Sequence, residues 1–418
     1  MKILIVNTSD IQGGAARAAY RLHKALLNLD IKSTMLVQNK STDDYTVKTI
    51  SNTKFQKITD KLRPYINNIP LIFYKNRTKT LFSTSLFGSN TVVNKINELN
   101  PDIVHLHWIV RGMIKIEDLK NIKAPIVWSL HDNWAFTGGC HIMWECEKYK
   151  NECGLCPRLG STKDNDLSRK IFKRKYIIFS KIENITIVGL SKWLTECSKN
   201  STLLKNKKHI NLPNPINTDI YKSFEKKKAR ELWNLPKNKK LVLFGAMDAT
   251  SDINKGFAEL IKALSILNLK NIELVVFGSN EPERSQNLGF KTHYMGHLHD
   301  DVSLVTLYSA VDVMIVPSLQ ESFGQTASES MACKTPVVAF GATGLLDIVN
   351  HKKNGYLAKP FDVEDLANGI EWVLNLDDNL YDKLCKNARE KVVREFDSKI
   401  VAKKYIELYK EVLNEKQS

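Results

Sequence analysis

The chain has 418 residues, of which 43% are hydrophobic and 25% charged, and its formal net charge is +16 at pH 7. This length exceeds what one hydrophobic core usually serves, so we expect two domains of an ordinary globular protein. The sequence has no apolar run near the roughly 18 residues of a membrane-spanning helix, and its apolar start is typical of a buried strand rather than a secretory signal, so we expect a cytoplasmic protein.

The N-terminal half alternates strands with helices. Residues 2–6 form an apolar strand, a glycine loop follows at Gly13-Gly14, and residues 15–29 carry apolar side chains at helical spacing. Residues 54–82 are basic and rich in aromatic side chains, without clean periodicity. Further strands are predicted at 33–38, 101–108, 125–132 and 185–191. This alternation indicates a parallel sheet with helices on both faces.

The same alternation restarts after residue 220. The linker is predicted at residues 211–223, where prolines interrupt the periodicity. A helix begins near Gly256, and an amphipathic helix ends the chain at 398–414. Strands are predicted at 241–247, 272–278, 311–318 and 335–340.

We therefore predict an α/β chain with two Rossmann-like, doubly wound parallel-sheet domains. They span 1–215 and 216–395, and the segment 396–418 is a helix packing toward the first domain. Open sheets of this kind bind ligands at the carboxyl ends of their strands, so we expect function in the loops that follow them.

The sharpest pattern is the stretch from Pro317 to Phe340. A strand ends at Pro317-Ser318, a polar loop carries Glu321, and Gly324 opens a helix that contains Glu329. A helix start exposes unpaired backbone N–H groups, which suit phosphate or sugar oxygens. Two surface glutamates without a common role are the alternative.

The spacing of Glu321 and Glu329 in ESFGQTASE resembles the E-x7-E pattern of retaining GT-B glycosyltransferases, and family GT4 in particular. Residues 131–157 also resemble a subset that builds bacterial exopolysaccharide, including colanic-acid-type enzymes. The resemblance implies the GT-B fold, in which two Rossmann-like domains face each other across a cleft. Other matches follow in the family's order at Gly13-Gly14, 101–108, 130–132, 214–221, Lys255-Gly256 and 354–358.

Carried over position by position, the resemblance implies that Glu321 holds hydroxyls of the donor sugar and that Glu329 binds the donor ribose. It also implies that backbone N–H groups of Phe323 and Gly324 help to hold the sugar and the phosphates. This agrees with elementary chemistry, because sugar transfer needs hydrogen-bond partners on the sugar and positive groups on the departing diphosphate.

The resemblance also implies which residue neutralises the diphosphate and which residues of the N-terminal domain contact the donor. Lys255 matches the lysine that neutralises the diphosphate, and Gly13 and Gly14 match a loop whose bare backbone approaches it. His131 matches a histidine beside the donor sugar and joins Glu321 as the catalytic pair. A surface lysine, a tight turn and a core histidine are the open structural alternatives for these positions.

The implied activity is that of a hexosyltransferase-type enzyme in surface polysaccharide biosynthesis. It would move a sugar with retention from a UDP- or GDP-sugar to a saccharide or lipid-linked acceptor, with no cofactor required for catalysis. The family's arginine after the strand ending at Gly245 is replaced by Ala246-Met247-Asp248. This difference keeps open a degenerate transferase acting as a binding partner. A nucleotide-sugar epimerase of similar architecture is a separate alternative.

Four cysteines cluster in one predicted loop with the spacing C-x5-C-x6-C-x2-C. This spacing, ending in a CxxC pair, favours a structural zinc site without a catalytic role. Free thiols and disulfides stay open. The four residues are Cys140, Cys146, Cys153 and Cys156.

Two basic clusters in the N-terminal half suggest contact with the inner face of an anionic membrane, where a lipid-linked acceptor would wait. A composition-driven, solvated face is the alternative. Nucleic acid is not expected, because no recognisable nucleic-acid-binding module accompanies the charge. The clusters comprise Lys54, Lys57, Lys61, Arg63, Lys75, Arg77 and Lys79, and Arg169, Lys170, Lys173, Arg174 and Lys175.

Overall fold

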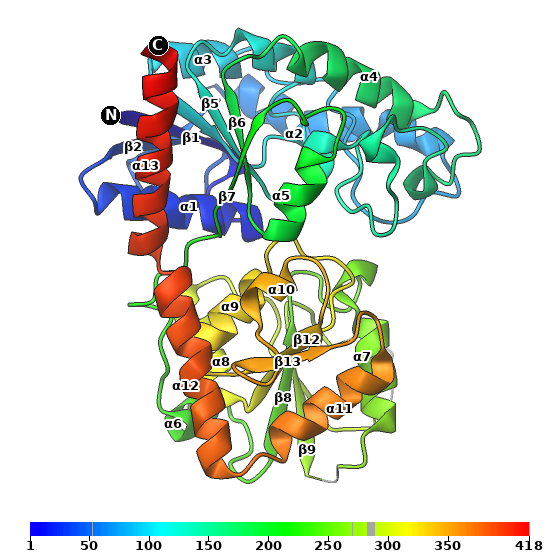
Figure 1. Ribbon diagram of the computed structural model, residues 1–418, viewed down its shortest axis with the longest axis vertical. Helices are drawn as coiled ribbons and strands as arrows, with labels where there is room; N and C mark the ends of the chain where they lie inside the picture. Colours follow the sequence, from blue (N-terminus) through cyan, green and yellow to red (C-terminus); the bar gives the residue numbers. More distant parts are fainter. Residues whose placement is uncertain (52, 270, 282–288, 418) are drawn as a thin grey trace. The chain divides into compact units, whose positions relative to one another are not determined.

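The computed structural model describes residues 1–51, 53–269, 271–281 and 289–417. The chain divides into two compact units, one formed by Met1–Pro215 with Val401–Ser418 and the other by Ile216–Ile400. Each unit is built around one parallel sheet (Figure 1). The predicted class, two doubly wound α/β domains, is confirmed.

In the described part of the first unit, the sheet has seven strands in the order β3-β2-β1-β4-β5-β6-β7. Parallel strands that are covered on both faces have nearly continuous apolar sequences. This is why the strands predicted for this half of the chain are present in the structure. The strands are β1 (Lys2–Ser9), β2 (Lys32–Asn39), β3 (Val47–Thr49), β4 (Ile103–Leu106), β5 (Ile126–Leu130), β6 (Ile185–Gly189) and β7 (Lys208–Asn211).

The second sheet, as far as the structure describes it, has six strands in the order β10-β9-β8-β11-β12-β13. Its core joins strand side chains such as Val242 and Ile315 to Leu260 and Ile370 on the covering helices. The strands are β8 (Lys240–Gly245), β9 (Ile272–Phe277), β10 (Thr292–Tyr294), β11 (Val313–Val316), β12 (Val337–Phe340) and β13 (Gly355–Ala358).

Helices fill the connections between the strands, and several begin at an Asp, Ser or Thr whose side chain accepts a hydrogen bond from the first turn. They are α1 (Gly14–Leu27), α2 (Lys54–Asn68), α3 (Val92–Glu98), α4 (Leu167–Phe179), α5 (Lys192–Lys199), α6 (Lys226–Leu232), α7 (Phe257–Ile266), α8 (Asp301–Ala310), α9 (Gln325–Ala332), α10 (Leu345–Ile348), α11 (Val363–Leu374), α12 (Asp378–Glu395) and α13 (Ser398–Gln417). None of the helices in the described ranges is both long and apolar enough to cross a membrane.

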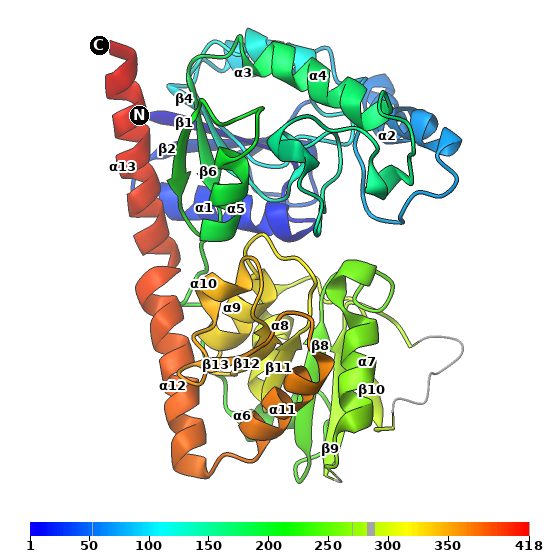
Figure 2. The same cartoon turned by 45° about the vertical axis from the view of Figure 1, so that its right-hand side comes forward.

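The last helix completes the core of the first unit. Val401, Tyr405 and Tyr409 of α13 are buried in one cluster with Ile3 of β1 and Val37 of β2. Figure 2 shows α13 running alongside these strands. The end of the chain is therefore a structural part of the unit that begins it.

The helix α2 was not predicted, and its side chains explain why. Thr53 and Gln56 form a capping box at its start. Its buried side chains are polar: Asp60 is ion-paired with Arg63, and Asn67 accepts hydrogen bonds from two backbone N–H groups. A helix that turns polar groups inward lacks the usual apolar core face, so its sequence does not look like that of a core-facing helix.

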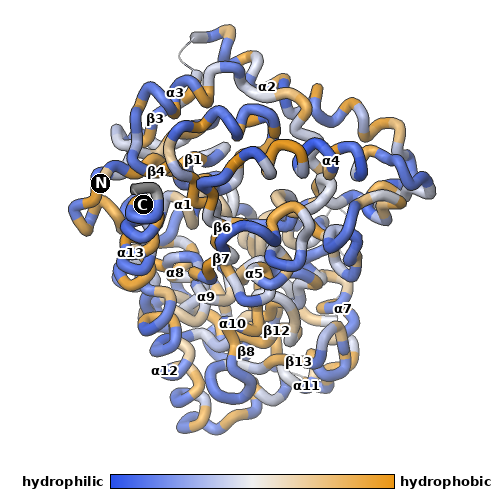
Figure 3. Tube along the Cα trace, turned by 45° about the horizontal axis from the view of Figure 1, so that its top comes forward, coloured by the Kyte–Doolittle hydropathy of each residue, from blue (hydrophilic) through white to orange (hydrophobic). Residues whose placement is uncertain are grey.

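The opposite side of α2 carries exposed apolar residues at helical spacing, and Figure 3 shows hydrophobic and hydrophilic residues interspersed along it. A short 3-10 helix, η1 (Ile69–Phe73), continues this surface; Ile72 is 72% exposed and Phe73 82%. Lys54, Lys57 and Lys61 are exposed on the same helix. We call this surface the α2 face; its large apolar members are Phe55, Ile58, Leu62, Tyr65, Ile66, Ile69, Ile72 and Phe73.

Candidate active site

In the second unit the strand order reverses between β8 and β11, which are hydrogen-bonded neighbours in the sheet. At such a point the loops after the two strands diverge and leave a crevice at the carboxyl edge, where doubly wound domains bind ligands. The loop after β8 leads to Lys255, and the loop after β11 carries Glu321. The topology therefore brings these two predicted residues together.

Lys255 and Glu321 form an ion pair, with 2.8 Å between Lys255 Nζ and Glu321 Oε1. Burial acts against the charge of Lys255, but the nearby Glu321 carboxylate outweighs it and raises the pKa of Lys255. The lysine is therefore charged at neutral pH. Its side chain is 23% exposed and that of Glu321 17%, so both are open to a ligand.

The two loops that carry this pair are fastened to each other. Asn254 donates its side-chain amide to the Gln320 carbonyl at 2.8 Å, and its own carbonyl accepts from the Leu319 N–H at 2.9 Å. Gly256 has φ 71°, and a Cβ there would lie 1.9 Å from the Pro317 carbonyl oxygen. Only glycine allows this approach, which explains the Lys255-Gly256 sequence.

Glu329 lies on α9 in a more enclosed position. It is buried, accepts a hydrogen bond from Tyr308 at 3.1 Å, and is 3.2 Å from the side-chain nitrogen of Gln325. The predicted helix opening is confirmed, because α9 begins after Gly324, which has φ 104°. Phe323 is buried just before it. Sequence reasoning missed Tyr308, which no local pattern connects to Glu329.

The first unit has an equivalent crevice edge, because its strand order reverses between β1 and β4. The loop after β1 carries Gly13, with φ 95°, and Gly14 begins α1. His131 follows β5, the neighbour of β4. The predicted residues of this unit therefore share the carboxyl edge of one sheet.

Asp132, next to His131, is the centre of a hydrogen-bond network. Its carboxylate accepts from the ring nitrogen of Trp108 at 2.7 Å and from the Trp134 N–H at 2.8 Å, and it lies 2.6 Å from His141 Nδ1. Burial opposes ionisation, but His141 and these donors lower the pKa of Asp132. The carboxylate fixes the backbone beside His131. His141 was missed, because its role depends on a contact across the loop.

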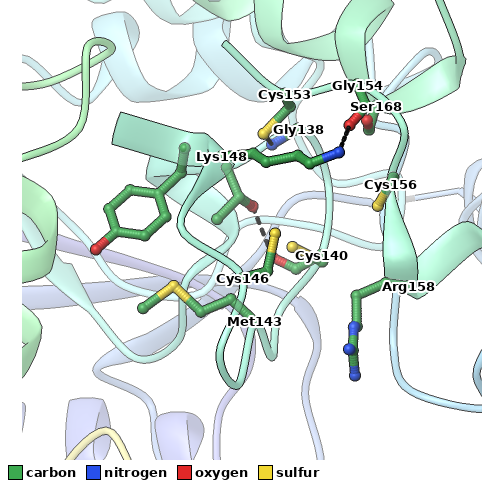
Figure 4. Close-up of a pocket in the computed structure, with 12 residues that line it drawn as sticks. Gly138, Cys140, Met143, Cys146, Lys148, Cys153, Gly154, Cys156, Arg158 and Ser168 are labelled. Carbon is green, nitrogen blue, oxygen red and sulfur yellow. Dashed lines mark hydrogen bonds between the residues drawn. The ribbon is translucent and has the colours of Figure 1, made fainter. Parts of the chain in front are cut away.

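The four clustered cysteines line one small cavity in the long loop between β5 and α4 (Figure 4). Cys153 accepts a hydrogen bond from the Gly138 N–H at 3.2 Å, and all four thiols are free. Within the described residues, no group of three or more His, Cys, Asp or Glu side chains is placed to hold a metal ion. The structural zinc site therefore stays a prediction.

Three of the five residues of the second basic cluster are buried or ion-paired, whereas Lys170 and Lys173 are exposed. Lys175 is buried and donates to the Thr137 carbonyl at 3.0 Å, and burial lowers its pKa to about 7. Arg169 pairs with Glu152, and Arg174 with Glu117. Lys170 and Lys173 share α4 with the exposed Tyr176 and Ile177, and the α2 face offers a longer run of exposed apolar residues beside its lysines.

Comparison with known proteins agrees with this geometry. The family model described as glycosyl transferases group 1 matches residues 225–391, which include Lys255, Glu321 and Glu329. An uncharacterized glycosyltransferase of Methanocaldococcus jannaschii is 30% identical over 333 residues, covering 74% of this chain and 82% of that protein. The chain belongs to the group 1 glycosyltransferases. The resemblance to family GT4 is confirmed, and members of this family use nucleotide-sugar donors.

Two further relatives of this group 1 glycosyltransferase are themselves named as glycosyl-transferring enzymes. The putative colanic acid biosynthesis glycosyl transferase WcaC of Escherichia coli is 29% identical over 38% of this chain and 40% of its own length. A Campylobacter jejuni enzyme named N,N'-diacetylbacillosaminyl-diphospho-undecaprenol alpha-1,3-N-acetylgalactosaminyltransferase is 29% identical over 46% of this chain and 50% of its own.

The solved structure of Anabaena HepE in complex with UDP-glucose has the same fold. It matches with a TM-score of 0.66 at 16% identity, covering 98% of this chain and 100% of HepE. Together with the two parallel sheets, this likeness confirms the GT-B fold.

Proposed function

We propose that this glycosyltransferase moves a hexose with retention from a UDP- or GDP-sugar to a saccharide or lipid-linked acceptor in surface polysaccharide biosynthesis. The Lys255–Glu321 pair at the crevice of the second sheet carries the proposal. A cation and a carboxylate side by side suit a ligand with a diphosphate at one end and sugar hydroxyls at the other. The UDP-glucose complex of HepE supports this class of donor.

In this proposal, different residues of the second unit bind different parts of the donor. Lys255 faces the diphosphate and stabilises the negative charge that develops as the bond to the sugar breaks. Glu321 holds hydroxyls of the transferred sugar, and the backbone around Phe323 and Gly324 contacts the phosphates. Glu329, oriented by Tyr308, binds the ribose.

The first unit, in this proposal, is the acceptor-binding domain 1–215, and 216–395 is the donor domain. Gly13 and Gly14 allow close approach of backbone to the diphosphate, and His131 contacts the donor sugar. The departing phosphate takes the acceptor's proton, so the residues need no separate general base. The Campylobacter jejuni relative, whose name contains a lipid-linked diphosphate saccharide, supports a lipid-linked acceptor.

To test this function, the purified chain is incubated with UDP- or GDP-hexoses as donors and lipid-linked diphosphate saccharides as acceptors. We expect release of nucleoside diphosphate, and a product whose new linkage keeps the donor's anomeric configuration by NMR. An inverted linkage would contradict the retaining mechanism. An epimerised sugar nucleotide formed without any acceptor would contradict transfer itself.

We further propose that the α2 face docks on the anionic inner surface of a membrane. Contiguous exposed apolar patches mark interaction surfaces, and an amphipathic helix with lysines beside its apolar side suits the boundary between head groups and acyl chains. The exposed lysines Lys54, Lys57 and Lys61 favour acidic lipid over a neutral apolar partner. Docking there would bring the enzyme to a lipid-linked acceptor.

Vesicle sedimentation tests this docking. The chain should bind vesicles that contain acidic phospholipid, and replacing Ile72 and Phe73 with Ser should weaken binding by about tenfold or more, because two apolar side chains no longer enter the lipid. Leu346 and Leu380 are also exposed, but lie in the second unit, so their replacement with Ser is the matched control. Equal binding to neutral and acidic vesicles, or no effect of the Ile72 and Phe73 changes, would contradict it.

A further inference from the structure

A buried histidine, His107, lies directly behind His131. His107 follows β4 and His131 follows the neighbouring strand β5, and His107 Nδ1 is 2.8 Å from His131 Nε2. His107 is buried, whereas His131 is only half-buried. Nothing in the proposed transfer uses His107 directly. Its contact with His131 suggests that it acts through that residue.

The surroundings of His107 hold it rigidly. Its ring packs against His105 with 4.2 Å between centroids, and its carbonyl accepts from the ring nitrogen of Trp128 at 3.1 Å. His105 is itself fixed between Tyr409 of α13, at 2.7 Å, and the Ser129 hydroxyl, at 2.8 Å. His107 therefore presents Nδ1 to His131 in one orientation.

Both rings of the contact are neutral at physiological pH. Burial lowers the pKa of His107 well below its usual value and that of His131 to about 4. A neutral imidazole carries one N–H, so the other nitrogen can only accept. Of the two facing nitrogens, one must therefore be the donor and the other the acceptor.

The far nitrogen of His107 decides which one donates. His107 Nε2 is buried and has no hydrogen-bond partner among the residues that the structure describes. A buried N–H without an acceptor is rarer and costlier than a bare lone pair. The proton of His107 therefore belongs on Nδ1, which donates to His131 Nε2.

We infer that His107 is a positioning residue that fixes His131 as its Nδ1–H tautomer. Because Nε2 accepts from His107, the remaining nitrogen of His131 can only donate. That atom suits a hydroxyl or phosphate oxygen of the sugar nucleotide and is unsuited to take a proton. The ligand's identity rests on the proposed function; the tautomer itself does not.

Nitrogen NMR of the full-length chain with ¹⁵N-labelled histidine tests the tautomer without any ligand. We expect wild-type His131, assigned by comparison with His131→Gln, to carry its proton on Nδ1 between pH 6 and 8. His107→Phe keeps a ring against His105 but removes the donor, so His131 should shift to a mixture of tautomers. His107→Asn, whose amide can donate from a similar position, should restore the wild-type signal.

Activity supplies the second readout. His107→Phe should lower kcat by about 10-fold to 100-fold with little change in the acceptor KM, because a misdirected hydrogen bond costs roughly that much, and His107→Asn should recover most of it. Wild-type His131 protonated on Nε2 overturns the inference, and so does a tautomer unchanged in His107→Phe. A fixed tautomer in a chain that transfers no sugar would instead contradict the proposed function alone.

Discussion

Replacing Glu321 with Gln is expected to lower kcat by about 10²- to 10³-fold, which corresponds to roughly 3 to 4 kcal/mol of transition-state stabilisation. Glutamine keeps the size of the side chain but removes the negative charge. A carboxylate holds sugar hydroxyls through charge-assisted hydrogen bonds, which are about twice as strong as neutral ones. The sugar develops positive charge in the transition state, so the missing negative charge should weaken transition-state binding more than ground-state binding. We therefore expect kcat to fall more than donor affinity.

Binding of a nucleoside diphosphate without sugar separates this role from a structural one. If Glu321 contacts the sugar, calorimetry should find that binding nearly unchanged in Glu321→Gln. Glu364→Gln, at an exposed position of α11, is the matched control and should keep wild-type rates. Near-normal turnover of Glu321→Gln would remove this residue from the mechanism.

Replacing Lys255 with Met is expected to lower kcat/KM by about 10³-fold or more, because the diphosphate loses its adjacent cation. Methionine keeps an unbranched side chain of similar reach, so the loop after β8 should stay in place. Here the affinity for a nucleoside diphosphate should fall as well, unlike in Glu321→Gln. Lys262→Met, at an exposed position of α7, controls for the loss of one positive charge.

The double variant resolves what the ion pair does. If Glu321 serves only to hold Lys255, then Lys255→Met with Glu321→Gln should be no slower than Lys255→Met alone. If each residue holds its own part of the donor, the double variant should be slower than either single variant. We expect the second result. Unchanged diphosphate affinity in Lys255→Met would contradict the assignment of this lysine.

Much of the fold could be predicted because buried parallel strands leave a direct signal. Strands such as β8 and β11 are continuous apolar runs, and Gly324 predicted the start of α9. The helix α2 could not be found, because its polar side chains face inward and its apolar ones face outward. The periodicity of apolar residues shows which side chains share one face of a helix, but not whether that face is buried in the core.

The site was only partly predictable for a related reason. Lys255 and Glu321 are 66 residues apart, and their pairing follows from the adjacency of β8 and β11, which no local pattern contains. Their selection came from a resemblance, not from spacing alone. Tyr308, His107 and His141 act through contacts between distant segments, so they became visible only in the folded chain.

The central claim is that the crevice after β8 and β11 binds the diphosphate of the donor. A crystal structure of the chain with a UDP- or GDP-hexose tests it most directly. We expect a phosphate oxygen within about 3 Å of Lys255 Nζ and sugar hydroxyls at hydrogen-bond distance from Glu321. A sugar nucleotide bound elsewhere, with Lys255 still paired to Glu321 and away from any phosphate, would contradict the account.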